Sequence, residues 1–207
     1  MLVFNKDNIL VILKELAKRM RKTFRDVDID IYVVGGATLT LLCDFRESTV
    51  DIDVAKNRNM DFRDIALTME EEFDLNHNWI NNDYMYSKSY SPKLVNYIER
   101  TYTFSNYIHY HFVKPACVAA MKCIALRVTT NDLSDIVNVV LYVDTLDNIV
   151  EIFKDLYSID FDDNLYQQIE AICNYMKIHC ITDVKNEISR LLKLYNNNIE
   201  YMIEDLM

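Results

Sequence analysis

The only two glycines of this 207-residue chain, Gly35 and Gly36, stand side by side directly after the apolar run Ile31-Tyr32-Val33-Val34. Glycine has no Cβ, so it suits positions where φ is positive or where another group touches the backbone. The run before it is rich in β-branched residues, which favours a strand. We therefore expect a strand that ends in a tight turn and leads into a short helix, with φ positive at the turn or a ligand within contact distance of its backbone.

Two carboxylates follow in a second strand-like segment. The alternation in Val50-Asp51-Ile52-Asp53-Val54 predicts a strand with Asp51 and Asp53 on one face and the apolar residues on the other. Two bare carboxylates about 5.5 Å apart repel by on the order of 3 kcal/mol at an effective dielectric of about 20. A divalent cation removes that repulsion, and hard oxygen ligands favour Mg²⁺ or Mn²⁺ over zinc. Taken alone, the same pattern also fits a merely polar edge strand.

Groups that bind phosphate lie near both features. Backbone N–H groups at the start of the helix after Gly36 would form a seat for a phosphate, helped by the helix dipole. Hydroxyl and guanidinium donors follow at Thr38, Arg46, Ser48 and Thr49. Each alone is more often a helix cap or a surface charge. Together with the glycine pair they predict a site for a metal-bound triphosphate.

A family resemblance rests on these residues. Gly35-Gly36-Ala37-Thr38-Leu39, followed by Arg46-x-Ser48-Thr49-x-Asp51-Ile52-Asp53, resembles the nucleotidyltransferase superfamily typified by DNA polymerase beta. Within it, the chain is similar to the AbiEii-like branch, which includes toxins of type IV toxin-antitoxin systems. The resemblance covers about residues 30 to 142. It implies a mixed β-sheet flanked by helices, with Asp51 and Asp53 as metal ligands.

The narrower match depends on the second half of the chain. Lys122 is the one charge in the apolar helical segment Cys117–Ala125, where an ammonium group is costly unless it meets a carboxylate or phosphate or reaches solvent along its own stem. Asn131-Asp132-Leu133-Ser134-Asp135 resembles the branch's Arg-Asp-x-x-Asp segment, with asparagine in place of arginine. The resemblance implies that Lys122 contacts the triphosphate and that Asp135 is a second catalytic carboxylate. Asp132 is equally consistent with an ordinary first-turn carboxylate.

Periodicity divides the chain into an α/β part and a helical part. We expect a nucleotidyltransferase core over residues 1–113 and a helical bundle over 114–207 that contributes Lys122 and Asp135 to the site. The core should contain helices at 5–24, 37–43 and 62–73 and strands at 28–34, 50–54, 93–104 and 107–113. A loop rich in asparagine and tyrosine spans 74–92 around Trp79, whose ring either packs in the core or stacks on a base.

The net charge and composition of the chain indicate which classes of partner it can bind. A net charge of −10 and a pI near 4.8 argue against passive coating of nucleic acid, although the basic cluster Lys14–Arg25 offers a local site, or simply a solvated helix face. Five scattered cysteines are typical of reduced core residues. With no signal peptide and no membrane span, we expect a soluble, cytoplasmic protein with no membrane partner.

The general base and the acceptor are left open. Many members of the superfamily use a third strand carboxylate, and Glu99 is the only acidic residue in the two later strands. His109 and His111 share one strand face, either as metal ligands or as ordinary sheet residues. The acceptor of a nucleotide from an NTP could be the 3′ end of a tRNA, a protein such as a cognate toxin or antitoxin, or a small molecule. The alternatives are a non-catalytic relative that binds nucleotide or a partner, and an acidic helical interaction protein.

Overall fold

The computed structural model describes residues 1–25, 27–56, 62–125, 130–195 and 198–206. The chain forms two compact units, Met1–Val118 and Ala119–Met207. The division falls inside helix α4, Pro115–Ala125. We treat the two units separately.

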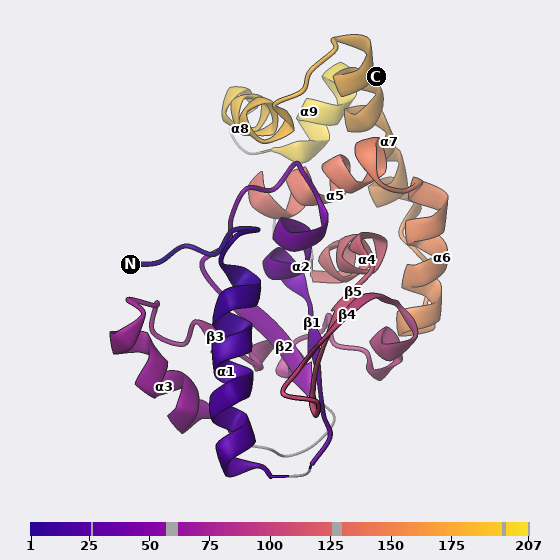
Figure 1. The fold of residues 1–207 in the computed structure, drawn as a ribbon. Coiled ribbons are helices and arrows are strands. Elements are labelled where there is room, and N and C mark those ends of the chain that lie inside the picture. The colour runs from indigo at the N-terminus through magenta and orange to yellow at the C-terminus, as the bar shows by residue number, and fades with distance from the viewer. Residues whose placement is uncertain (26, 57–61, 126–129, 196–197, 207) are drawn as a thin grey trace. The chain divides into compact units, whose positions relative to one another are not determined.

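The first unit is built on a mixed sheet (Figure 1). In the described residues its order is β3-β2-β1-β5-β4. The strands are β1 (Ile29–Val33), β2 (Ile52–Lys56), β3 (Ile80–Asn81), β4 (Ile98–Phe104) and β5 (Ile108–Val113). β1 is parallel to β5 and β2 is parallel to β3, whereas β1 with β2 and β4 with β5 are antiparallel. The predicted α/β fold class, a mixed sheet with helices followed by a helical part, is confirmed.

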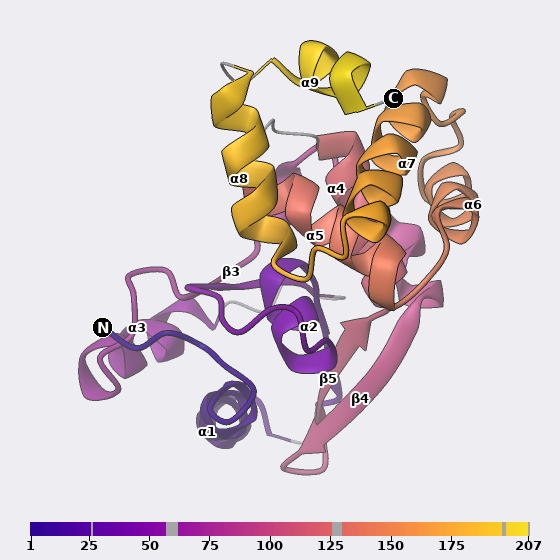
Figure 2. The same ribbon diagram turned by 90° about the horizontal axis from the view of Figure 1, so that it is seen from above.

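Three α-helices accompany this sheet in the described residues. They are α1 (Ile9–Thr23), α2 (Gly35–Leu42) and α3 (Arg63–Glu72), and α1 is seen almost end-on in Figure 2. The apolar side of α1, including Leu13 and Met20, packs with Ile31, Val33 and other sheet residues into one core, because its apolar residues recur every three or four positions. That packing leaves the opposite side of α1 to solvent.

Several boundaries in the first unit differ from the sequence prediction, and the predicted loop 74–92 contains β3 and a 3-10 helix; two of the differences have a clear local cause. The strand expected to begin at Lys93 begins at Ile98, because Pro92–Asn96 form a 3-10 helix in which the Ser91 hydroxyl accepts a hydrogen bond from the Lys93 N–H at 3.3 Å. Val50 was expected to share the buried face of Ile52. Instead it precedes β2 and is 56% exposed, since residues 49 and 50 turn to pair Thr49 with Phe4.

The second unit is helical. After α4 come α5 (Thr130–Tyr142), α6 (Leu146–Tyr157), α7 (Asp163–Ile178), α8 (Val184–Leu194) and α9 (Ile199–Leu206). Side chains cap the starts of α7 and α8: Asp162 accepts the Leu165 N–H at 2.9 Å, and Asp183 accepts the Asn186 N–H at 3.1 Å. Among the helices that are described, none is long and apolar enough to cross a membrane.

The cysteines give a simple test of both units. Cys43, Cys117, Cys123 and Cys173 are buried, whereas Cys180 is exposed, contrary to the expectation that all five lie in the core. Burial raises the pKa of Cys117, Cys123 and Cys173 to about 12, so these thiols stay protonated and unreactive. We expect the folded protein to react with a thiol reagent at about one site per chain, lost in Cys180→Ala. Rapid labelling of several thiols without denaturant would contradict this packing.

Candidate functional site

Gly35 lies where a side chain would meet a carboxylate. It begins α2 directly after β1, with φ at +62°, and a Cβ built on it would lie 2.7 Å from Asp53 Oδ2. The positive φ expected from the sequence is present, and the group close to the backbone here is a protein carboxylate, whereas the sequence argument expected a ligand. The consequence is that the Asp53 carboxylate is packed against the backbone at the start of α2.

Gly36 lies against Arg46 and Thr49, two residues that the sequence predicted to bind phosphate. A Cβ there would lie 2.7 Å from Arg46 Nη2 and 2.7 Å from Thr49 Oγ1. The guanidinium and the hydroxyl thus approach the first turn of α2 as closely as the Asp53 carboxylate does. The glycine pair brings a cation, an anion and a hydroxyl donor onto the helix start where backbone N–H groups lack helical partners.

Thr49 links Asp51 to this group. Its hydroxyl donates to Asp51 Oδ1 at 3.3 Å, and its backbone is held by two hydrogen bonds with Phe4, of 2.8 and 2.9 Å. Asp51 itself lies just before β2, and both Asp51 and Asp53 are half-buried. Ser48 is exposed beside them along the chain. The two carboxylates are thus held on a fixed backbone with part of their surface open to solvent.

Thr38 has a role inside the fold. It is fully buried, and its hydroxyl donates to the carbonyl oxygen of Val33 at 2.8 Å. This bond ties α2 back to the end of β1 and so helps to hold the sharp turn between them. Its predicted contact with a phosphate stays a prediction.

Tyr84 was one of the loop tyrosines that the sequence offered for stacking on a base, but its position near Asp53 was not predicted. It lies in the 3-10 helix Asp83–Tyr86 and is mostly buried. Burial raises the pKa of its hydroxyl well above the usual range, and the nearby Cys117, Tyr90 and Asp53 groups raise it further. Tyr84 is therefore a neutral phenol close enough to Asp53 to feel its charge. The tyrosine-rich composition of residues 74–92 marked the segment but not the individual side chain.

Trp79 belongs to the core. Its ring is fully buried, lies 5.8 Å from the ring of Phe4, and donates from Nε1 to the Ala66 carbonyl oxygen at 3.2 Å. Of the two uses weighed for this ring, packing is correct, and stacking on a base is excluded because no ring surface is open. The segment around Trp79 is ordered by this burial and places β3 beside β2.

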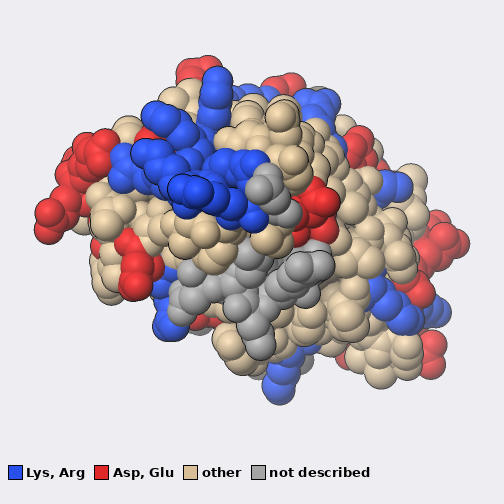
Figure 3. Space-filling view, turned by 60° about the horizontal axis from the view of Figure 1, so that its bottom comes forward, with Lys and Arg blue, Asp and Glu red and all other residues tan. Residues whose placement is uncertain are grey.

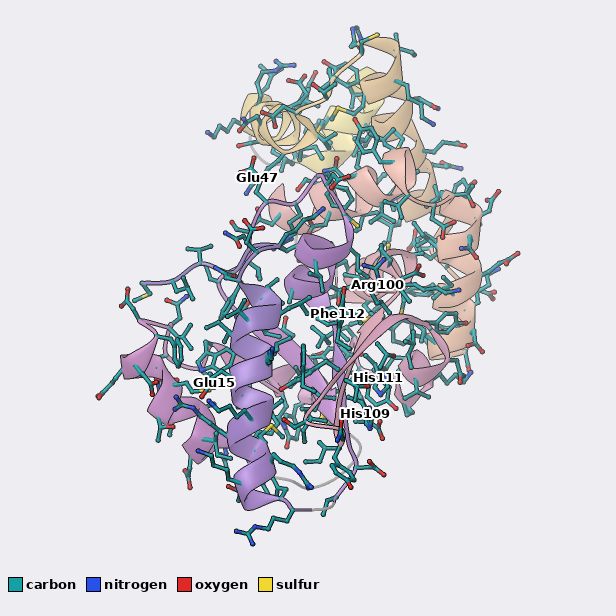
Figure 4. The ribbon with its side chains drawn as sticks, viewed as in Figure 1. Glu15, Glu47, Arg100, His109, His111 and Phe112 are labelled. Carbon is teal, nitrogen blue, oxygen red and sulfur yellow. The ribbon has the colours of Figure 1, made fainter. Side chains whose placement is uncertain are left out.

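The histidines on the sheet pair with acidic residues other than Asp53. His109 and His111 extend from β5 on the face opposite to Phe112 (Figure 4). There His111 Nε2 lies 2.9 Å from Asp30 and His109 Nε2 lies 3.6 Å from Asp28. Among the described residues no group of three metal-ligating side chains is found. Glu99 is on β4, which in the sheet order is three strands from β2, or about 14 Å.

Lys122 lies in a buried ion cluster of the second unit. Its ammonium contacts the Asp132 carboxylate directly and Asp135 Oδ2 at 3.1 Å, and the three side chains are 16%, 19% and 7% exposed. The sequence argument that this lysine needs a carboxylate or a phosphate is met by two carboxylates, and the alternative that it reaches solvent is wrong. Lys122 is thus the ammonium that Asp132 and Asp135 share in this cluster.

The comparisons add one finding. A family model described as "Nucleotidyltransferase of unknown function (DUF6036)" matches residues 8–181, which include the glycine pair, both carboxylates and the Lys122 cluster. Neither a curated protein nor a solved structure was found to match the chain.

Proposed function

Because the chain belongs to the DUF6036 family of nucleotidyltransferases of unknown function, we propose that it transfers a nucleoside monophosphate from an NTP to an acceptor hydroxyl. The observation that carries this proposal is the packing of Asp53 on Gly35 and of Arg46 on Gly36. It supplies a carboxylate for a metal and a guanidinium for a phosphate at one helix start. A nucleotidyl transfer needs both of these groups together.

The donors fit a hard divalent cation. Asp51 and Asp53 are half-buried carboxylates, and no third His, Cys, Asp or Glu among the described residues completes an all-protein metal cage with them. Such a two-carboxylate set suits Mg²⁺ or Mn²⁺, which keep room for water and phosphate oxygens. When bound, the ion would neutralise charge on the triphosphate and on the leaving pyrophosphate.

The protein's own part in the reaction is positioning. Arg46 would hold phosphate oxygens through its guanidinium, while Thr49 orients Asp51 through its hydrogen bond. The N–H groups at the start of α2 would face the same phosphate chain, with Thr38 keeping that start in place. Little covalent chemistry is required of the side chains in such a reaction.

We also propose the AbiEii-like assignment and a role in a toxin-antitoxin pair. Its support is the Lys122 cluster, in which Asp132 and Asp135 stand at the spacing of that branch. In this proposal Lys122 contacts the triphosphate and Asp135 acts as a second catalytic carboxylate. The acceptor stays open among RNA, protein and small molecule.

The test uses NTPs labelled at the α-phosphate. Wild-type protein with Mg²⁺ and whole-cell extract is expected to transfer label to an acceptor, and Asp51→Asn/Asp53→Asn is expected to lose at least about a hundredfold in rate, as for loss of a metal site. Glu99→Gln is the matched control, since this exposed carboxylate lies three strands from β2 and its loss should leave the rate unchanged.

Measuring NTP binding distinguishes an enzyme from a non-catalytic relative and from an interaction protein. NTP affinity measured by calorimetry should fall in Arg46→Ala, and this readout does not depend on the acceptor. Clear NTP affinity without any transferred label would support the non-catalytic relative. Absence of NTP affinity in wild type would refute the site and favour an interaction protein.

A further inference from the structure

A row of exposed cations runs along one side of α1. Lys14, Lys18 and Lys22 recur every four residues and are exposed, and exposed Arg25 follows the helix end. Figure 3 shows lysine and arginine side chains gathered over this part of the first unit. At 1.5 Å per residue, the row from Lys14 to Lys22 is about 12 Å long. It is a concentrated positive surface in a protein whose net charge is −10.

Most of the row's charge is not neutralised by neighbours. Glu15 pairs with Arg19 at 3.0 Å and with Lys18 at 3.2 Å, while Arg19 also pairs with Glu72 at 2.7 Å. Lys18 is nevertheless 64% exposed, so its pair is weak. Within the described residues neither Lys14 nor Lys22 has an acidic partner within ion-pair distance. These ammonium groups are available to an external anion.

A groove with aromatic walls adjoins the same lysines. It has a volume of about 420 Å³ and is lined by the apolar residues Val11, Phe73 and Phe104 and by the polar residues Lys14, Glu15, Lys18 and Ser105. Phe73 follows α3 and Phe104 ends β4, so the groove lies between elements of the first unit alone. Its size and apolar walls suit a flat ring, and the lysines suit a charge attached to that ring.

We propose that the row Lys14-Lys18-Lys22 and the adjoining groove bind a single-stranded nucleic acid, with phosphates on the lysines and a base in the groove. Cations that follow a backbone beside aromatic rings are the combination that single strands recognise. A membrane does not fit, because the apolar side of α1 is buried in the core. An acidic peptide would use the lysines but not the aromatic walls. This binding does not depend on nucleotide transfer at Asp53.

The experiment measures fluorescence anisotropy of labelled 12-residue oligomers, uridine RNA and thymidine DNA, at about 50 mM salt and above. Binding should weaken with salt at a slope of about −2 for three phosphate contacts. Lys14→Glu/Lys18→Glu/Lys22→Glu should bind at least about tenfold more weakly and lose that slope. The matched control is Lys177→Glu/Lys185→Glu/Lys193→Glu, which changes three exposed lysines of the second unit by the same total charge. It should bind like wild type.

A second variant tests the groove rather than the charge row. Val11 is 62% exposed, so Val11→Asp places a carboxylate in the groove without disturbing the core, and Val143→Asp, at 46% exposed, is its control. Only Val11→Asp should weaken binding. Stronger binding of RNA than of DNA would identify RNA as the natural strand, and the reverse would identify DNA. The proposal would be overturned if both triple variants lost affinity equally or if the wild type bound neither oligomer. Full competition by polyglutamate would also overturn it and would identify an acidic protein as the partner.

Discussion

Replacing Gly35 with alanine is expected to destabilise the first unit by about 2 kcal/mol or more and to displace Asp53. An alanine at φ of +62° carries a penalty of about 1–2 kcal/mol, and its Cβ would stand 2.7 Å from Asp53 Oδ2, well inside contact distance. Urea unfolding followed by tryptophan fluorescence measures the loss, because Trp79 is the only tryptophan and is buried in this unit.

A double variant separates the two causes. Asp53→Ala removes the carboxylate that the new Cβ would strike, so Gly35→Ala should cost less in that background, with the backbone strain left over. Gly36→Ala should destabilise less than Gly35→Ala, because its φ is not positive and only the 2.7 Å contacts with Arg46 Nη2 and Thr49 Oγ1 oppose the new Cβ. Equal stability of Gly35→Ala and wild type would disprove the conformation described for the turn.

Replacing Lys122 with methionine is expected to destabilise the second unit by about 3–5 kcal/mol. The change leaves Asp132 and Asp135 close together, 19% and 7% exposed, with their shared cation gone. Removing one partner from a buried ion cluster costs more than the cluster's net contribution, because the two carboxylates stay buried while they lose the ammonium that they share. Thermal unfolding followed by circular dichroism measures the loss, because this signal includes the helices of the second unit. The fluorescence of Trp79 reports only on the first unit.

The same unit offers a matched control. Lys154 pairs with Asp160 at 3.7 Å, but the two side chains are 52% and 99% exposed, so Lys154→Met should change stability by less than about 0.5 kcal/mol. Adding Asp132→Asn and Asp135→Asn to Lys122→Met should recover part of the loss, because neutral amides do not repel. A Lys122→Met protein as stable as Lys154→Met would show that the cluster is not buried in solution.

Local chemistry accounts for what could be predicted about the site. Only glycine tolerates both the positive φ at Gly35 and the contact with Asp53, so its place in the chain already marked the turn. The spacing of Arg46 and Thr49 after it pointed to the same helix start, and the structure brings both onto Gly36. In the same way, the apolar surroundings of Lys122 in the sequence predicted that its ammonium group would contact a carboxylate or a phosphate.

Tertiary packing decided the rest. Val50 follows the strand pattern, yet the pairing of Thr49 with Phe4 turns it to solvent. Trp79 and Tyr84 come from one segment rich in asparagine and tyrosine, and only tertiary contacts bury the first in the core and bring the second near Asp53. By itself the sequence determined the helices, most of the strands and the glycine turn, because these follow from periodicity and backbone sterics. Only the folded structure decided which polar side chains meet, because such pairs depend on burial between residues far apart in the chain.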